Sequence, residues 1–233
     1  MKLALLGYGK MGQTIERLAK EQGHEIVYKR SSSTSEGHLK DAEAAIEFSS
    51  PEAAVENITS CFEHGIPVIS GTTGWLDRYE EVLKIGKDRN ASFIYASNFS
   101  IGVNLFFSIN AYAAKLFEPW KEYTASIEEI HHTQKKDAPS GTAISLAEGI
   151  LEHSDKKEWK LDRQSDDALT ITAKRIEDVK GTHIIRYDSA IDSISLEHEA
   201  HSRDGFAKGA ILAAEWLQGK KGIYSMKDVL QIK

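Results

Sequence analysis

The sequence predicts an α/β protein whose N-terminal part has a mostly parallel sheet and whose second part is an α+β domain. Three observations lead to this prediction. A glycine-rich turn near the N-terminus separates a short apolar run from an amphipathic segment, and apolar runs then alternate with helical patterns up to about residue 100. Beyond that point the alternation stops and strand-like runs follow one another. The length of 233 residues suits one large or two small domains.

The first elements form a strand, a turn, a helix and a second strand. Residues 3–6 are apolar, residues 7–12 contain three glycines, and apolar residues within 13–20 lie at helical spacing. A second strand-like run follows at 25–28. This order predicts a βαβ unit.

The glycine turn has the spacing Gly-x-Gly-x-x-Gly. Gly7 permits a tight turn, Gly9 lets the backbone approach a pyrophosphate, and Gly12 allows the helix to pack closely on the strand. The helix N-terminus adds amide hydrogens and the positive end of a dipole. Because the turn lies between a strand and a helix, we predict a Rossmann-type dinucleotide site that includes Lys10 and Met11. The alternative is a purely structural glycine turn.

The second predicted strand ends in two cations. An NAD site usually has Asp or Glu here for the ribose hydroxyls, whereas Lys29 and Arg30 suit a 2′-phosphate. We therefore expect NADPH as the preferred cofactor and NADH as the alternative. Arg30 is the stronger candidate because a guanidinium can pair with phosphate and stack on adenine. A solvated loop surface is the structural alternative.

Alternating elements continue along the first domain. Strands are expected at 44–48, 66–69 and 92–95, and helices at 51–58 and 78–87. This alternation predicts a parallel sheet covered on both faces, with ligands at the carboxyl ends of its strands. Two polar corners follow strands and should border the nicotinamide half of the cofactor. They consist of Gly71, Thr72 and Thr73, and of Ala96, Ser97, Asn98 and Phe99.

The pattern changes after about residue 101. One long amphipathic helix is expected first, and three strand-like runs arrive later with little helix between them. The last run alternates strictly, as a half-exposed strand does, so an antiparallel or mixed sheet is expected. The expected elements are helices near 103–117, 144–151 and 206–217, strands at 124–129, 169–174, 182–187 and 193–199, and an exposed loop at 153–167.

The segment containing His131, His132 and Lys135 has the densest polar chemistry in the chain. A stretch Asp-Ala-Pro-Ser-Gly-Thr follows and is typical of a helix start. A histidine or the lysine could donate a proton, and the amides of Gly141 and Thr142 could hold a carboxylate. The structural alternative is a capped helix behind a surface loop.

This segment resembles the signature of a known family. Residues 129–143, Glu-Ile-His-His-x-x-Lys-x-Asp-Ala-Pro-Ser-Gly-Thr-Ala, look like the signature of the dihydrodipicolinate reductases, also called 4-hydroxy-tetrahydrodipicolinate reductases. The resemblance extends over nearly the whole chain. Its other motifs are the N-terminal glycine turn and residues 48–51, 71–74, 97–104, 181–183 and 206–210.

The resemblance implies a role for each matching residue. His131 would be the proton donor and acceptor, and Lys135 the second proton donor and substrate cation. We add Arg203 as a candidate for a substrate carboxylate, with a surface arginine as the alternative. The expected substrate contacts are His132, Gly141, Thr142 and Arg203.

The resemblance also implies an organisation and an activity. Residues 1–101 and 204–233 would form the Rossmann domain, because the C-terminal helix returns to it, and residues 102–203 would bind substrate and assemble a homotetramer. The family uses NAD(P)H to reduce 4-hydroxy-tetrahydrodipicolinate, a small cyclic dicarboxylate, to tetrahydrodipicolinate in the diaminopimelate route to lysine. Lys10 replaces an arginine common in the family, and Lys29 replaces an acidic ribose ligand.

Composition excludes several other classes. A net charge of −6 disfavours binding to nucleic acids and anionic membranes, and no apolar run approaches the roughly 20 residues that span a bilayer. Cys61 is the only cysteine, so neither an intrachain disulfide nor a thiolate metal cluster is expected. No metal is expected on His131 and His132, because adjacent histidines do not easily chelate one ion. The N-terminus lacks signal-peptide features, so a cytoplasmic location is expected.

Two rival functions remain open at this point. Another two-domain oxidoreductase, such as an amino-acid dehydrogenase, would share the first 100 residues but should lack the histidine–lysine segment. A nucleotide-sensing protein that is not an enzyme would bind NADPH without turnover.

Overall fold

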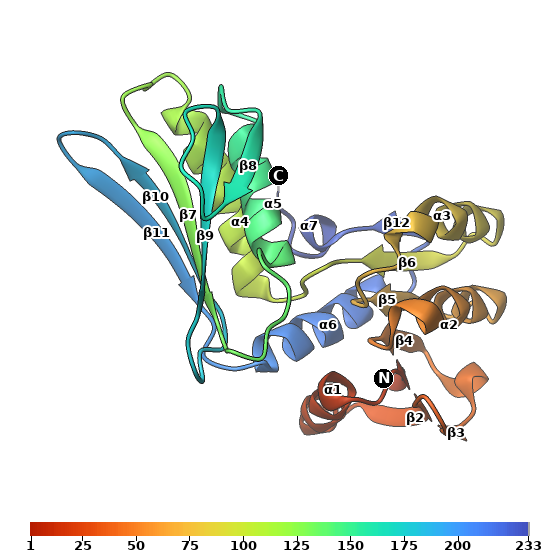
Figure 1. Ribbon diagram of the computed structural model, residues 1–233. Helices are drawn as coiled ribbons and strands as arrows, with labels where there is room; N and C mark the ends of the chain where they lie inside the picture. The colour runs from red at the N-terminus through yellow and green to blue at the C-terminus, as the bar shows by residue number, and fades with distance from the viewer. Residues whose placement is uncertain (233) are drawn as a thin grey trace. The chain divides into compact units, whose positions relative to one another are not determined.

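The computed structural model describes residues 1–232 and divides into two compact units (Figure 1). The first unit comprises Met1–Ile101 and Asp204–Lys233, and the second comprises Gly102–Arg203. The chain therefore leaves the first unit once and returns to it. Among the described residues, no helix has the length and apolar character needed to cross a membrane.

A seven-stranded sheet forms the centre of the first unit, in the order β12-β6-β5-β4-β1-β2-β3. All neighbouring strands are parallel except β3, which pairs antiparallel with β2. β2 and β3 follow on one side of β1, whereas β4, β5 and β6 follow on its other side. The strand order therefore reverses between β1 and β4. In sheets of this kind, ligands bind at the carboxyl ends of the strands beside the reversal. The strands are β1 (Lys2–Leu6), β2 (Glu25–Arg30), β3 (Ser35–Gly37), β4 (Ala44–Glu47), β5 (Val68–Ser70), β6 (Ser92–Tyr95) and β12 (Gly222–Tyr224).

Helices cover both faces of this sheet. Alternation along β1 sends Leu3 and Leu5 into one apolar cluster and Ala4 and Leu6 into the other. The first cluster packs against α1 and α6, and the second against α2 and α3. The helices are α1 (Lys10–Glu21), α2 (Pro51–Glu63), α3 (Tyr79–Asp88), α6 (Asp204–Leu217) and α7 (Met226–Val229), with short 3₁₀ turns at Leu39–Asp41 and Leu76–Arg78.

Helix α6 lies very close to the backbone of the segment that follows β6. A Cβ atom on Gly209 would lie 1.7 Å from the carbonyl oxygen of Phe99, so only glycine fits there. Fully buried alanines at 207, 210, 213 and 214 continue this small-residue face. The C-terminal segment is thus an integral layer of the first unit.

The second unit is built on a five-stranded mixed sheet in the order β11-β10-β7-β9-β8. β10 is antiparallel to β7 and β11, whereas β9 is parallel to β7 and β8. Apolar residues of α4 and α5 form one core with Ile127, Leu169 and Ile185. The elements are α4 (Ile101–Phe117), β7 (Thr124–His131), α5 (Gly141–Leu151), β8 (Glu158–Leu161), β9 (Ala168–Arg175), β10 (Thr182–Asp188) and β11 (Ser193–Glu199).

One expectation about this unit was wrong. Residues 153–167, predicted as an exposed loop, contain strand β8. Trp159 and Leu161 alternate with charged residues and pack against the core, while β8 pairs with β9. Four residues between polar neighbours give too short a pattern to separate a strand from a loop. The predictions of an α/β first part and a mixed sheet in the second are confirmed.

Candidate active site

Strand β7 and the start of α5 position the candidate catalytic residues. β7 is the central strand of its sheet, and alternation places Ile127, Glu129 and His131 on the buried face. A nine-residue connection leads from His131 to Gly141, the first residue of α5. Ser140 is the N-cap, and its hydroxyl oxygen accepts a hydrogen bond from the amide of Ala143 at 3.2 Å. The side chains of strand and helix start therefore meet inside the unit.

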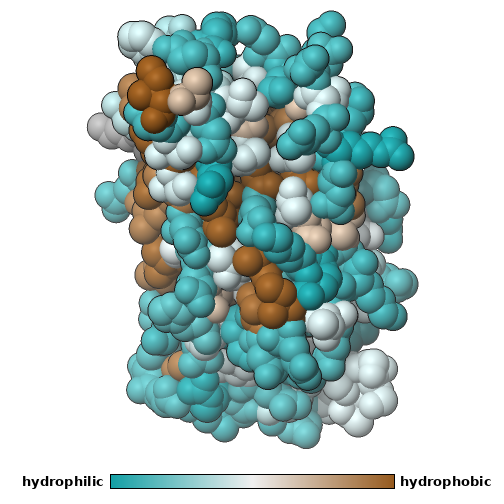
Figure 2. All heavy atoms as spheres, turned by 60° about the vertical axis from the view of Figure 1, so that its left-hand side comes forward, coloured by the Kyte–Doolittle hydropathy of each residue, from teal (hydrophilic) through white to brown (hydrophobic). Residues whose placement is uncertain are grey.

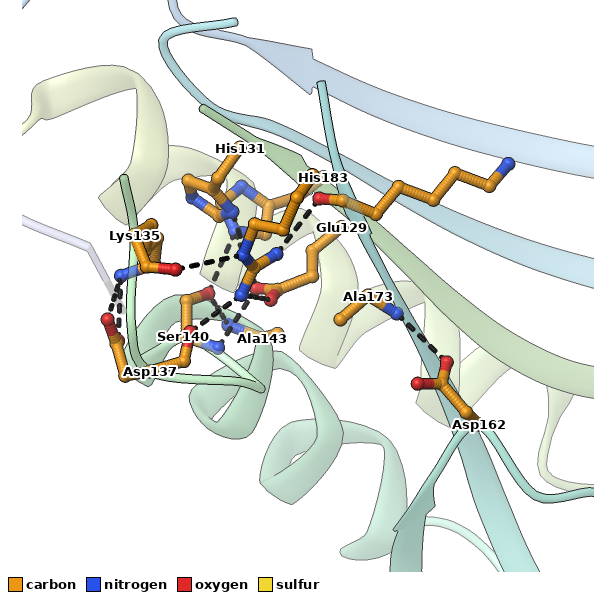
Figure 3. Close-up of polar contacts among 11 residues, drawn as sticks. Glu129, His131, Lys135, Asp137, Ser140, Ala143, Asp162, Ala173 and His183 are labelled. Carbon is orange, nitrogen blue, oxygen red and sulfur yellow. Dashed lines mark hydrogen bonds and ion pairs between the residues drawn. The ribbon is translucent and has the colours of Figure 1, made fainter. Parts of the chain in front are cut away.

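Glu129 is the centre of this site, with a fully buried side chain (Figure 3). Its Oε2 accepts a hydrogen bond from the amide of Ser140 at 2.9 Å, and its Oε1 accepts one from Arg175 Nη2 at 3.2 Å. The Nδ1 atom of His131 and the Nε2 atom of His183 lie 3.6 and 3.9 Å from Oε2. A buried carboxylate thus faces one guanidinium, one backbone amide and two imidazoles.

The sheet register explains why these residues meet. His183 on β10 lies directly opposite Glu129 across the antiparallel pairing. Arg175 at the end of β9 lies opposite His131 across the parallel pairing. Their side chains consequently share the face of the sheet that α5 covers. The hydroxyl of Ser140 lies 3.2 Å from His183 Nε2 and completes the cluster.

Burial keeps both imidazoles neutral near pH 7. Burial is the largest cause of a lowered pKa at His131; the charge of Glu129 opposes it, and the charges of Lys135 and Arg175 lower it further. Burial also lowers the pKa of His183 to about 3, with smaller contributions from His131, His198 and Lys135. Neither histidine is therefore the cation of this site.

Lys135 places an ammonium group in the connection between β7 and α5. Its ammonium group lies 2.9 and 2.7 Å from the two carboxylate oxygens of Asp137 (Figure 3). The side chain of Asp137 is 61% exposed, so this ion pair is weak. Arg175 also donates hydrogen bonds to the carbonyl oxygens of Lys135 and Asp137, at 3.3 and 2.6 Å. Arg175 therefore holds both the side chain of Glu129 and the backbone of the connection that carries Lys135.

The other expected substrate residues take different places. Gly141 is exposed at the positive end of α5, and no described residue outside its own helix turn and chain neighbours has an atom within 4 Å of where its Cβ would be. Thr142 follows in the same turn, and His132 is half-buried just after β7. Arg203 is exposed at the last position of the second unit, and no contact of the described residues brings it to the cluster.

Sequence reasoning missed three members of the cluster. Glu129 and His183 belong to the quoted motifs but received no role. Arg175 was missed entirely, because its place follows from the pairing of β9 with β7, which no local pattern shows.

One oxygen of Glu129 and one ring nitrogen each of His131 and His183 lie within 4.8 Å of one another, a distance at which three ligands can hold a metal ion. The carboxylate already accepts hydrogen bonds from Arg175 and from the amide of Ser140. A dication would have to compete with this guanidinium, so the charges of the cluster disfavour a metal.

The glycine turn of the first unit suits a pyrophosphate. Gly7 has φ +101°, and a Cβ there would lie 1.9 Å from the carbonyl oxygen of Phe48. Gly9 is the N-cap of α1 and has no side chain to cap it, and apart from its chain neighbours no described residue has an atom within 4 Å of its Cβ position. Lys10 is exposed and Met11 half-buried in the first turn of the helix. The uncapped helix start and the open space at Gly9 fit the phosphates of a dinucleotide.

Both cations at the end of β2 already have carboxylate partners. Lys29 lies 3.2 Å from Glu36 and 3.8 Å from Glu16, and Arg30 lies 2.7 Å from Glu56. The side chains of Glu36 and Glu56 are 71% and 70% exposed. Such surface pairs are worth roughly 0–1 kcal/mol, so a phosphate could replace them.

A second buried carboxylate holds Thr72 of the first predicted cofactor corner. Glu47, at the end of β4, is fully buried and accepts hydrogen bonds from the hydroxyls of Ser70 and Thr72 at 2.6 and 2.9 Å. It also accepts the hydroxyl and the amide of Ser49. The ends of β4 and β5 are therefore locked together. In the corners themselves, Gly71 and Ala96 are half-buried, Thr73 and Ser97 exposed, and Thr72, Asn98 and Phe99 buried.

Comparison with known proteins agrees over both units. Residues 1–99 match the family described as "Dihydrodipicolinate reductase, N-terminus", and residues 102–230 match "Dihydrodipicolinate reductase, C-terminus". The 4-hydroxy-tetrahydrodipicolinate reductase of Christiangramia forsetii is 54% identical over 233 residues, covering 99% of this chain and 98% of that protein. The protein of the same name from Aquifex aeolicus is 40% identical over 222 residues, covering 92% and 82%.

A solved structure shows the same fold. The dipicolinate-bound dihydrodipicolinate reductase from Paenisporosarcina sp. TG-14 has a TM-score of 0.79, covers 100% of this chain and 99% of its own, and is 20% identical. The Rossmann type of the N-terminal domain implies a nicotinamide dinucleotide as cofactor. With matches across both units and full-length relatives at 54% and 40% identity, the chain belongs to the dihydrodipicolinate reductase family.

Proposed function

We propose that this protein uses NAD(P)H to reduce 4-hydroxy-tetrahydrodipicolinate to tetrahydrodipicolinate, in the diaminopimelate route to lysine. The cluster of His131, Lys135 and the start of α5 carries the proposal, because it joins a proton-transfer group, a cation and a helix N-terminus. Relatives at 54% and 40% identity bear the name of this reductase.

The substrate is a small cyclic dicarboxylate, the class of ligand that the dipicolinate-bound relative holds. Lys135 is the cation for one carboxylate, and the positive end of α5 at Gly141 supports it. His132 lies beside this segment, and Thr142 is in the same helix turn. We assign the second carboxylate to Arg203, which is exposed.

The C4 hydroxyl of the substrate leaves as water, and the nicotinamide, when bound, would supply the hydride that is added at C4. The protein must then provide a proton and hold the negative charge that develops on the substrate ring. Lys135 carries an ammonium proton close to His131, whereas His131 is neutral near pH 7 because burial lowers its pKa. Lys135 therefore donates the proton, and His131 relays or accepts protons through its ring nitrogens.

NADPH is the preferred cofactor in this proposal, and NADH the alternative. Lys29 and Arg30 end the strand that contacts the ribose in Rossmann domains, and their nearest carboxylate partners, Glu36 and Glu56, are exposed. The 2′-phosphate, a doubly charged group, would replace Glu36 and Glu56 as the partner of Lys29 and Arg30. Gly7, Gly9 and the first turn of α1 hold the pyrophosphate, and the Gly71–Thr73 and Ala96–Phe99 corners border the nicotinamide.

The two units would divide the work. Residues 1–101 with 204–233 bind the dinucleotide, and residues 102–203 bind substrate and assemble a homotetramer. β11 is an edge strand, and α4 carries a row of exposed apolar side chains, so the second unit has surface to bury. The row on α4 consists of Ile101, Leu105, Ile109, Tyr112 and Leu116, with Trp120 just beyond the helix. Figure 2 shows further hydrophobic patches among hydrophilic residues on the side that is at the left of Figure 1.

A mass measurement tests this assembly: light scattering on the purified chain should give four times 25.9 kDa. A monomer at micromolar concentration contradicts it. We also propose a cytoplasmic location, where reduced nicotinamide and the other soluble enzymes of such a pathway are found.

Nicotinamide absorbance tests the activity. The substrate is made in situ by the preceding synthase, and wild type, Lys135→Ala and Lys136→Ala are compared with NADPH and NADH. Lys136 is the matched control, an exposed lysine in the same loop. We expect Lys135→Ala to lose about 10²–10⁴-fold in kcat/KM and Lys136→Ala to keep wild-type activity. Cofactor binding without oxidation by any of the three proteins would refute the reductase and favour a nucleotide sensor.

A further inference from the structure

A structural role alone does not explain the ion pair between the buried carboxylate of Glu129 and Arg175. Full burial of a carboxylate is costly, and an apolar pair of similar size would serve packing at least as well. The neighbouring ion pair on the opposite face of the same strands, Glu128 with Lys174 at 2.6 Å, remains partly exposed. We therefore looked for a chemical role of the Glu129–Arg175 pair, and His131 lies beside it.

The two nitrogens of His131 have different surroundings. Its Nδ1 atom is buried, has no hydrogen-bond partner among the described residues, and lies 3.6 Å from Glu129 Oε2. Its Nε2 atom lies beside Gly181, where a Cβ would be only 3.3 Å away. The absence of a side chain at Gly181 keeps that nitrogen uncrowded. A small rotation of the ring closes the Nδ1–carboxylate bond and leaves Nε2 for proton transfer.

Charged and titratable groups reach His131 from every neighbouring element. Glu129 comes from its own strand, Arg175 from β9 and His183 from β10, while Lys135 and Asp137 come from the connection to α5. The charge of Glu129 stabilises the imidazolium, whereas Arg175 and Lys135 destabilise it. Opposed charges on two strands thus act on one ring.

We propose that Glu129 and Arg175 are positioning residues of opposite effect on His131. Glu129 fixes the tautomer with hydrogen on Nδ1 and favours protonation at Nε2. Arg175 holds Glu129 in place and limits that protonation, so that His131 remains neutral until a proton is needed. A carboxylate that orients an imidazole in this way is a common device in catalysis and at metal-bound histidines. The inference rests on the proposed function for the role of His131 in turnover, but its effect on the ring can be measured without turnover.

Two substitutions that remove charge but keep a polar side chain test the proposal, namely Glu129→Gln and Arg175→Gln. The pKa of His131 is followed by NMR titration of its ring in the intact protein, with the signal assigned by His131→Gln. Glu129→Gln should move this pKa down by about 1–3 pH units, and Arg175→Gln should move it up. General loosening of the site would re-expose the ring and move both variants in the same direction.

The outer ion pair provides matched controls on the same strands. Glu128→Gln and Lys174→Gln make the same changes on the other face of the sheet and should leave the pKa of His131 at its wild-type value. Arg175→Lys keeps the charge and should restore most of the effect. In turnover, Glu129→Gln should lower kcat about 10²–10⁴-fold with little change in KM, and the limb of the kcat/KM profile that belongs to His131 should move with the NMR value.

Shifts of the same sign in both variants, or no larger than in the controls, overturn the proposal. If Glu129→Gln does not fold, Arg175→Gln and Arg175→Lys still decide it, because only the former should raise the pKa. Stoichiometric zinc in purified protein, lost from His183→Gln and removed by a chelator, would instead assign Glu129, His131 and His183 to a metal. Opposite shifts without reductase turnover would keep this inference and reject the proposed function.

Discussion

The buried imidazole of His183 should make the protein lose stability in mild acid. Burial, with His131, His198 and Lys135, lowers its pKa from 6.5 to about 3. Below pH 6.5 the unfolded chain binds a proton that the folded chain excludes, so stability falls as pH falls and the loss is complete only near pH 3. The slope is about 1.4 kcal/mol per pH unit, which amounts to about 2 kcal/mol between pH 6.5 and pH 5.

Urea unfolding at pH 7.5 and pH 5.0 measures this loss. His183→Gln has no titrating group at this position and retains a polar side chain beside Ser140, so it should lose about 2 kcal/mol less than wild type on acidification. The comparison cancels the packing change of the substitution, which is present at both pH values, and the titration of the remaining carboxylates. Equal losses in the two proteins would show that His183 is protonated in the folded state, and the account of its burial would be wrong.

Three further predictions concern the first unit. Gly209→Ala should lower the free energy of unfolding by at least about 1–3 kcal/mol, because its Cβ would lie 1.7 Å from a carbonyl oxygen, whereas Gly205→Ala in the same helix has 3.6 Å of space and should not. Glu47→Gln should cost about 1–3 kcal/mol and raise the NADPH Kd in calorimetry, since an amide cannot accept all its hydroxyl donors. Lys29→Ala with Arg30→Ala should reduce the NADPH-to-NADH ratio of kcat/KM about tenfold or more, and an unchanged ratio rejects the phosphate assignment.

Local patterns were sufficient for most of the fold. The glycine turn lies between β1 and α1, and the strict alternation of residues 193–199 became β11. Periodicity succeeds there because each segment buries one face, and burial is what the pattern records. The prediction missed β8 because only two of its side chains reach the core. The short strand β12 was not foreseen, since three residues carry no period.

The site divides in the same way between local and long-range information. His131, Lys135 and Gly141 lie within one segment, so their proximity follows from the chain itself. Arg175 reaches Glu129 only because β9 pairs in parallel with β7, at a register that the sequence does not encode locally. Arg203 received the role of substrate cation from its type and position alone, and Arg175 is the arginine that the described contacts place in the cluster.

The return of α6 and β12 to the first unit affects how the protein can be synthesised. Much of one apolar cluster of the parallel sheet, from Ala207 to Val229, is supplied by the last thirty residues of the chain. A ribosome has made everything else before these residues emerge, so one face of the nascent sheet is covered by α1 alone until α6 is made. Premature termination after residue 203 would leave that face open for good, and such fragments should be clients of chaperones and proteases rather than free-standing nucleotide-binding domains.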